Sequence, residues 1–189
     1  MRDAHPSLGT SEPASADVAL LNQAIRLVDG LPDALFTCAT SFTPGGNVGR
    51  HLRHCLDFYD SFLRGFLSGR VDYVHRARDE EVETRRSRAL ERLHDAARRL
   101  ERIAPAELER PLFVRAEDEP IGASPGSGTC WSRSTVHREL QFLASHTVHH
   151  FALIAVLLRT LGHEPPAEFG IAPSTLRQWR ESALEAAAG

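Results

Sequence analysis

Long stretches of this chain place apolar residues three and four positions apart, the spacing that puts them on one face of an α-helix. Such runs extend from about Ala16 to Val28, from Asn47 to Leu67, from Thr84 to Ile103 and from Thr135 to Leu161. A shorter amphipathic run starts at Ser174. Four helices of this length can bury a common core, so the pattern predicts an all-α protein with a helical-bundle architecture.

The stretch 111–133 departs from the helical spacing. PLFVRAE alternates like a strand, EDEPIGASPGSG is rich in turn-forming residues, and TCWSRS can return as a partner strand. We therefore expect a small β-hairpin, or two extended strands, in the long connection before the last bundle helix. In the short carboxy-terminal helix, Leu176, Trp179 and Leu184 share a face, and we expect this face to dock on the bundle.

Composition is that of a single domain. The chain has 189 residues, of which 42% are hydrophobic and 25% charged, enough for a sizeable core. Residues 1–15 are rich in Pro, Ser, Gly and charge, as in a disordered tail, so we place the domain at residues 16–189. A net charge of -3 predicts no general affinity for nucleic acid. All 22 basic residues are arginines, which excludes lysine Schiff-base chemistry.

Cysteine usage and the first residues indicate a cytoplasmic protein. Cys38, Cys55 and Cys130 form no CxxC pair and are too scattered for a disulfide framework, which suits a reducing compartment. The first twenty residues lack the apolar core of a secretory signal. No uninterrupted apolar run reaches the ~18 residues of a membrane-spanning helix, so we expect no membrane association.

Three histidines, His146, His149 and His150, lie inside the most apolar run of the chain. On a helix, His146 and His150 project from one side, one turn apart, while His149 points to the opposite face. Two neutral imidazoles rarely hold a metal ion alone, so a third ligand must come from another helix. The second long run carries His51 and His54 beside its apolar stripe. This pattern leaves two interpretations open: a three-histidine metal site, and hydrogen-bonded core histidines.

The segments HLRHCLDFYDSF and SHTVHHFALIAVLLRTLG resemble the DinB superfamily, also called YfiT-like metal-dependent hydrolases, whose bundle domain also occurs in thiol S-transferases. The family pattern is a histidine in a setting such as HLxH on the second helix, and HxxxH near LLRxxG on the last bundle helix. The resemblance implies a four-helix bundle, frequent homodimers, and one divalent metal held by His54, His146 and His150. Helical periodicity places His51 nearer the apolar stripe than His54, so His51 remains the alternate ligand.

A site with three imidazoles keeps coordination positions open, as catalytic rather than structural zinc sites do. Zinc is the default metal, and nickel, manganese and iron are the alternatives. The resemblance implies hydrolysis of a small molecule or transfer of a small thiol, with the metal activating a bound water or thiol. The alternative is a non-catalytic protein whose bundle serves metal binding, dimerisation or the binding of a partner.

The polar connection after the second helix, RVDYVHRARDEEVETRR, also has two interpretations. The simpler one is a solvated loop that ends in a helix cap. The other is a loop that folds over the metal site, with Tyr73, Arg76 and Arg78 contacting an anionic substrate. Glu139 lies seven residues before His146 on the same helix face, where it can hydrogen-bond an imidazole or pair with a neighbouring arginine.

Overall fold

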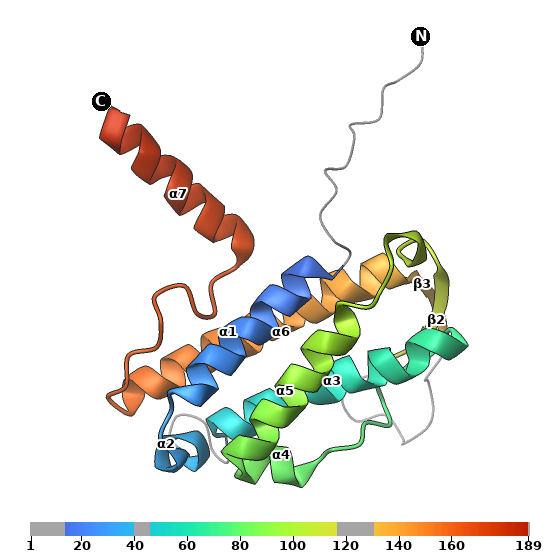
Figure 1. The fold of residues 1–189 in the computed structure, drawn as a ribbon, viewed down its shortest axis with the longest axis horizontal. Coiled ribbons are helices and arrows are strands. Elements are labelled where there is room, and N and C mark those ends of the chain that lie inside the picture. The colour runs from blue at the N-terminus through green and yellow to red at the C-terminus, as the bar shows by residue number, and fades with distance from the viewer. Residues whose placement is uncertain (1–13, 40–45, 117–130, 189) are drawn as a thin grey trace, which may run out of the picture.

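The computed structural model of this chain describes residues 14–39, 46–116 and 131–188, and it is mostly helical (Figure 1). Residues 1–13, which hold most of the expected disordered tail, and the expected turn at 117–128 lie outside these ranges. The helical class predicted from the spacing of apolar residues is confirmed, and a small sheet accompanies the helices.

Four long helices surround the apolar core: α1 (Ser15–Asp29), α3 (Val48–Ser68), α5 (Arg86–Leu100) and α6 (Val136–Thr160). α3 contacts both α5 and α6, and α1 contacts the same two helices. Each of these four helices therefore has two of the others as neighbours, and α3 and α6 lie side by side. This contact between α3 and α6 is where the predicted histidines meet.

The two histidine-bearing helices are capped by Asn47 and Thr135, the residues at which the apolar runs were expected to start. The Asn47 side chain accepts a hydrogen bond from Arg50 N at 2.7 Å, and the Thr135 hydroxyl accepts one from Arg138 N at 3.2 Å. These caps satisfy backbone donors that have no partner inside a helix. Gly69 ends α3 in the left-handed conformation with φ 73°, which costs glycine little.

The helix expected from about Thr84 to Ile103 is α5, and a further short helix that was not predicted precedes it. A short helix, α4 (Glu80–Thr84), comes first, and Arg85 is extended before α5 begins. The Asp79 side chain caps α4 by accepting a hydrogen bond from Glu81 N at 3.2 Å. The sequence did not reveal α4 because this helix buries a single apolar residue, Val82, which gives no periodicity to detect.

A three-stranded sheet joins the end of α3 to the start of α6. β2 (Pro111–Arg115) and β3 (Ser132–Thr135) pair antiparallel, as expected from the alternation in this region. β1 (Arg70–Asp72) pairs parallel with β2 and was not predicted, since three residues are too few to show alternation. Gly65 allows this arrangement, because a Cβ at that position of α3 would overlap the carbonyl oxygen of Arg70.

The carboxy-terminal helix α7 (Pro173–Ala188) extends away from the other helices (Figure 1). Trp179 is 54% exposed and Leu184 is 71% exposed, so the expected docking of this helix on the core was wrong. The segment before α7 is the part that packs: the Phe169 ring stacks on Phe151 of α6, with centroids 4.6 Å apart.

Two further short elements are α2 (Asp33–Thr37) and the 3-10 helix η1 (Pro105–Glu107).

By length and composition, α6 is the one helix in the described ranges that could cross a membrane. Core helices of soluble proteins often have the same properties, and α6 packs against α1, α3 and β3. Its buried face includes Leu140, Leu143, Ile154 and Leu158. We therefore interpret the apolar character of α6 as that of a core helix.

Candidate metal centre

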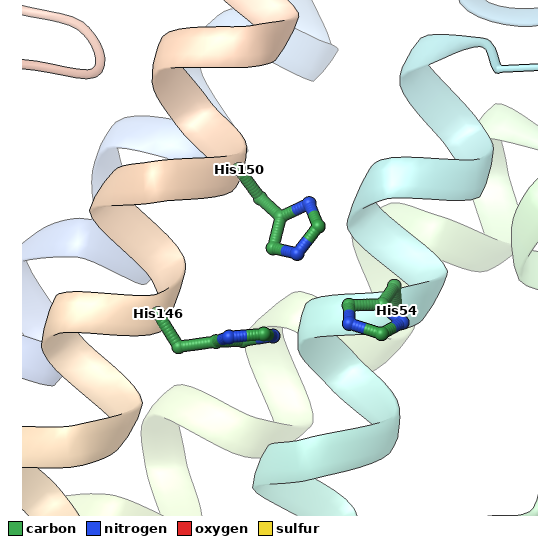
Figure 2. A group of neighbouring side chains, drawn as sticks. All are labelled: His54, His146 and His150. Atoms are coloured by element: carbon green, nitrogen blue, oxygen red, sulfur yellow. The ribbon is translucent and has the colours of Figure 1, made fainter. Parts of the chain in front are cut away.

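Three histidines from two helices turn toward a common space (Figure 2). His54 comes from α3, and His146 and His150 come from consecutive turns of α6. One ring nitrogen from each lies within 4.8 Å of the others. The ring centroids are 5.0 Å apart for His54 and His146, and 4.5 Å apart for His54 and His150. The structure thus brings together the three residues that the resemblance implied.

The geometry is close to what a metal ion requires. Zinc–nitrogen bonds of about 2.1 Å in a tetrahedral site place ligand nitrogens roughly 3.4 Å apart, so modest side-chain rotation would close the group around an ion. The Nε2 atom of His146 is buried and has no hydrogen-bond partner among the described residues. An unpaired buried polar atom costs about 1–3 kcal/mol, and coordination of an ion would remove that cost. The donor set therefore fits a divalent metal.

The three imidazoles are neutral at physiological pH. Burial lowers the pKa of His54 to about 4, and the neighbouring charges of His146 and Arg76 add to the effect. Burial, followed by the charge of His54, lowers the pKa of His150 to about 3. The pKa of His146 is also lowered, mainly by burial. Because only the neutral ring offers a lone pair to a metal, protons do not compete for these nitrogens near pH 7.

His51, the alternate ligand, lies beside this group in a different position. Its Nδ1 atom is 3.1 Å from Nδ1 of His150, within hydrogen-bond distance. It does not belong to the group of three whose nitrogens lie within 4.8 Å of one another. His149 is exposed, in agreement with the prediction that it points to the opposite face of the helix.

Comparison with known proteins identifies the family of this chain. The family model described as "DinB family" matches residues 21–180, most of the sequence. The chain belongs to the DinB family. A curated relative, "FK506-binding protein 5" of Rhizopus delemar, is 34% identical over 107 residues. That match covers 57% of this chain and 27% of the relative, so this DinB-family chain spans only about a quarter of that protein's length.

The loop expected to contact a substrate contributes one side chain close to the histidines. The Arg76 guanidinium lies over the Phe58 ring, 4.6 Å from its centroid, and its charge lowers the pKa values of His54 and His146. Arg78 is exposed, and its backbone has the uncommon φ of 51°. Of the two arginines, Arg76 is the one placed to act near the site.

Tyr73, the third loop residue expected to contact a substrate, lies in the core of the protein. It is only 1% exposed, and its hydroxyl donates a hydrogen bond to Oε2 of Glu139 at 3.0 Å. Ser134 of β3 donates to the other carboxylate oxygen of Glu139 at 2.5 Å. Glu139 therefore joins the loop and the sheet to α6, and neither partner expected for it, an imidazole or an arginine, is the one that the structure records. The simple interpretation of a solvated loop is wrong for Tyr73, because its side chain is in the core.

Two phenylalanines of this DinB-family chain form an apolar wall against the histidines, and the sequence reasoning missed them. The Phe58 ring lies 4.4 Å from that of His146 and 5.1 Å from that of His54, between centroids. Phe142 stacks on His146 at 5.6 Å. Each is four residues from a candidate ligand on its own helix, and that spacing could have identified both. The wall places apolar rings against one side of the site, and electrostatic interactions are stronger beside apolar groups than in water.

Proposed function

We propose that this DinB-family protein is a four-helix bundle that holds one divalent metal ion through His54, His146 and His150. The observation that carries the proposal is the group of three imidazoles, one of which has a buried nitrogen without a partner among the described residues. Three neutral ligands keep coordination positions open for a substrate or a water molecule. Zinc is the first choice, with nickel, manganese and iron as alternatives.

The reaction that suits this centre is hydrolysis of a small molecule or transfer of a small thiol. When bound, the ion acts as a Lewis acid and lowers the pKa of a water molecule or thiol, which supplies the nucleophile. In this proposal Arg76 binds an anionic group of the substrate, and Arg78 extends that contact from the exposed part of the loop. Tyr73 supports the aromatic wall behind the site through its contacts with Phe58 and Phe142.

A second candidate function is binding without catalysis. The exposed Trp179 and Leu184 of α7 favour it, because a helix with an uncovered apolar face is a common contact surface. In this version the protein is a cytoplasmic homodimer or binds another protein, and the metal stabilises the fold. The two candidates share the same histidine site and differ in whether a substrate reaches it.

The metal content of untagged protein tests the shared part of both candidates. We expect about one divalent ion per chain by elemental mass spectrometry, and loss of the ion in the single variants His54→Ala, His146→Ala and His150→Ala. His149→Ala is the matched control, since it removes an exposed histidine of the same helix and should keep the ion. Full metal content in all three ligand variants would disprove the site.

Screens with metal-loaded and metal-free protein then separate the two candidates. Hydrolysis or thiol transfer that requires the ion, and that weakens in Arg76→Gln, supports the enzyme. Stable dimers that dissociate when Trp179 is replaced by serine, without any metal-dependent turnover, support the binding protein.

A further inference from the structure

His51 lies outside the candidate ligand group but contacts one of its members, His150. Nδ1 of His51 lies 3.1 Å from Nδ1 of His150, and the ring centroids are 5.3 Å apart. A hydrogen bond between two ring nitrogens needs a proton on one of them and a lone pair on the other. The contact therefore restricts which nitrogen of His150 carries its proton.

Metal binding decides whether the proton of His150 lies on Nδ1 or on Nε2. Nδ1 of His150 is engaged by His51, so Nε2 is the nitrogen that remains for an ion. Figure 2 shows one nitrogen of the His150 ring facing His54 and His146, with the other nitrogen on the far side of the ring. A nitrogen that binds a metal must have a bare lone pair, so the proton of neutral His150 has to sit on Nδ1.

We infer that His51 is a positioning residue for the metal centre: it accepts the hydrogen bond of Nδ1–H of His150 and so holds Nε2 of His150 toward the ion. The inference rests on the proposed metal site and assigns His51 a role different from that of alternate ligand. Metal-binding histidines commonly donate their second N–H to a group that fixes the ring and its tautomer. In this chain a second histidine, one turn before the ligand His54, takes that place.

The rival role for His51 is ligation. Its Nε2 atom, like that of His146, is buried without a hydrogen-bond partner in the described part of the chain. Position argues against ligation, because the group whose nitrogens lie within 4.8 Å of one another contains His54, His146 and His150. Two substitutions at position 51 distinguish the roles. Asparagine places an amide oxygen close to the position of Nδ1 and can accept a hydrogen bond but does not replace an Nε2 ligand, and leucine provides no acceptor.

The experiment is a zinc titration against a chromophoric chelator, with wild type, His51→Asn, His51→Leu and His54→Ala. We expect one zinc per chain in the first three proteins. The affinity of His51→Asn should be within about threefold of wild type, and that of His51→Leu about 10- to 100-fold weaker. Loss of stoichiometric zinc in both position-51 variants, as in His54→Ala, would make His51 a ligand and overturn the inference. Wild-type affinity in His51→Leu would also overturn it and leave the proposed function intact.

Nitrogen-15 NMR of the zinc-loaded protein gives a readout that a purely structural role would not change. We expect Nδ1 of His150 to be protonated and Nε2 to show the shift of a zinc-bound nitrogen, while Nδ1 of His51 has no proton. Zinc bound to a nitrogen of His51, or to Nδ1 of His150, contradicts the inference. A wild-type protein that binds no divalent ion contradicts the proposed function and the inference together. Wild-type affinity in His51→Leu contradicts the inference alone, so the two failures are distinguishable.

Discussion

Two polar clusters lie along the contact between α3 and α6, and they differ in how completely their atoms are paired. In the first, the Tyr59 hydroxyl donates to Oδ1 of Asp17 at 2.9 Å and accepts from the Thr147 hydroxyl at 3.1 Å. All three side chains are buried. In the second cluster the histidines are half-buried, and Nε2 of His146 has no partner in the described ranges. A closed network holds three helices together, whereas an open group of nitrogens is available to a ligand.

The clusters also differ in which protonation state burial favours. Burial raises the pKa of the Asp17 carboxyl to about 7, although the hydrogen bond from Tyr59 works in the opposite direction. Burial lowers the pKa values of His54 and His150. Desolvation favours the neutral form in both cases. The same physical cause shifts the Asp17 carboxyl toward its neutral form and keeps the histidine ligands neutral.

The largest expected effect is the stabilisation of the histidine cluster by an ion. At a zinc concentration about 1,000 times the dissociation constant, binding should add about 4 kcal/mol to the free energy of unfolding. His150→Ala should lose this gain, because it removes a ligand. Urea unfolding with zinc and with a chelator measures both values. An equal gain in the variant would show that the ion binds elsewhere.

The pH dependence of stability probes the first cluster, formed by Asp17, Tyr59 and Thr147. The pKa of Asp17 is about 7 in the folded protein and near the ordinary value of 3.8 for an aspartate when unfolded, so the folded state binds the extra proton. The contribution of this group is complete below the unfolded pKa and is lost as the pH rises through 7, by up to about 4 kcal/mol. The histidines act in the opposite direction, since their folded pKa values are lowered.

Asp17→Asn isolates this contribution, because the amide cannot titrate and still accepts a hydrogen bond from Tyr59. The free energy of unfolding of wild type minus that of the variant should fall between pH 5 and pH 8. Chelator in every sample removes any contribution from metal. A difference that stays constant over this range would mean that the Asp17 carboxyl is already ionised at pH 5.

Removal of the Tyr59 hydroxyl tests whether the two clusters are independent of each other. Tyr59→Phe leaves the Asp17 carboxyl and the Thr147 hydroxyl without their shared partner, which should cost about 1–3 kcal/mol of stability. Zinc stoichiometry should remain at one per chain, because Tyr59 is not among the candidate ligands. Denaturation and metal content, measured on the same preparation, check both parts. Loss of zinc from a folded variant would show that the two clusters form one unit.

The difference between the clusters could be predicted from the sequence only in part. The i, i+4 spacing placed His146 and His150 together, and the two runs expected to start at Asn47 and Thr135 form helices that these residues cap. The choice between His51 and His54 depends on how α3 is rotated against α6, which the periodicity of one helix does not determine.

Contacts between distant segments could not be predicted. Tyr73 and Glu139 are 66 residues apart, and nothing in either local sequence indicates that they form a hydrogen bond. The three residues of β1 acquire their structure from pairing with β2. The amphipathic character of α7 indicated an apolar face at Trp179, but it did not indicate what covers that face.

The smallest expected effect concerns the positive charge of Arg76 beside the histidine cluster. Arg76 lies over Phe58, and its positive charge lowers the pKa values of His54 and His146, so it must also oppose a divalent cation. Arg76→Gln should therefore bind zinc a few-fold more tightly, by about 0.5–1 kcal/mol, an effect that added salt should reduce. Zinc titration at low and high ionic strength measures it, with the exposed Arg78→Gln as control. If Arg76→Gln binds zinc more weakly, the arginine supports the site through packing on Phe58 and has no role as a competing charge.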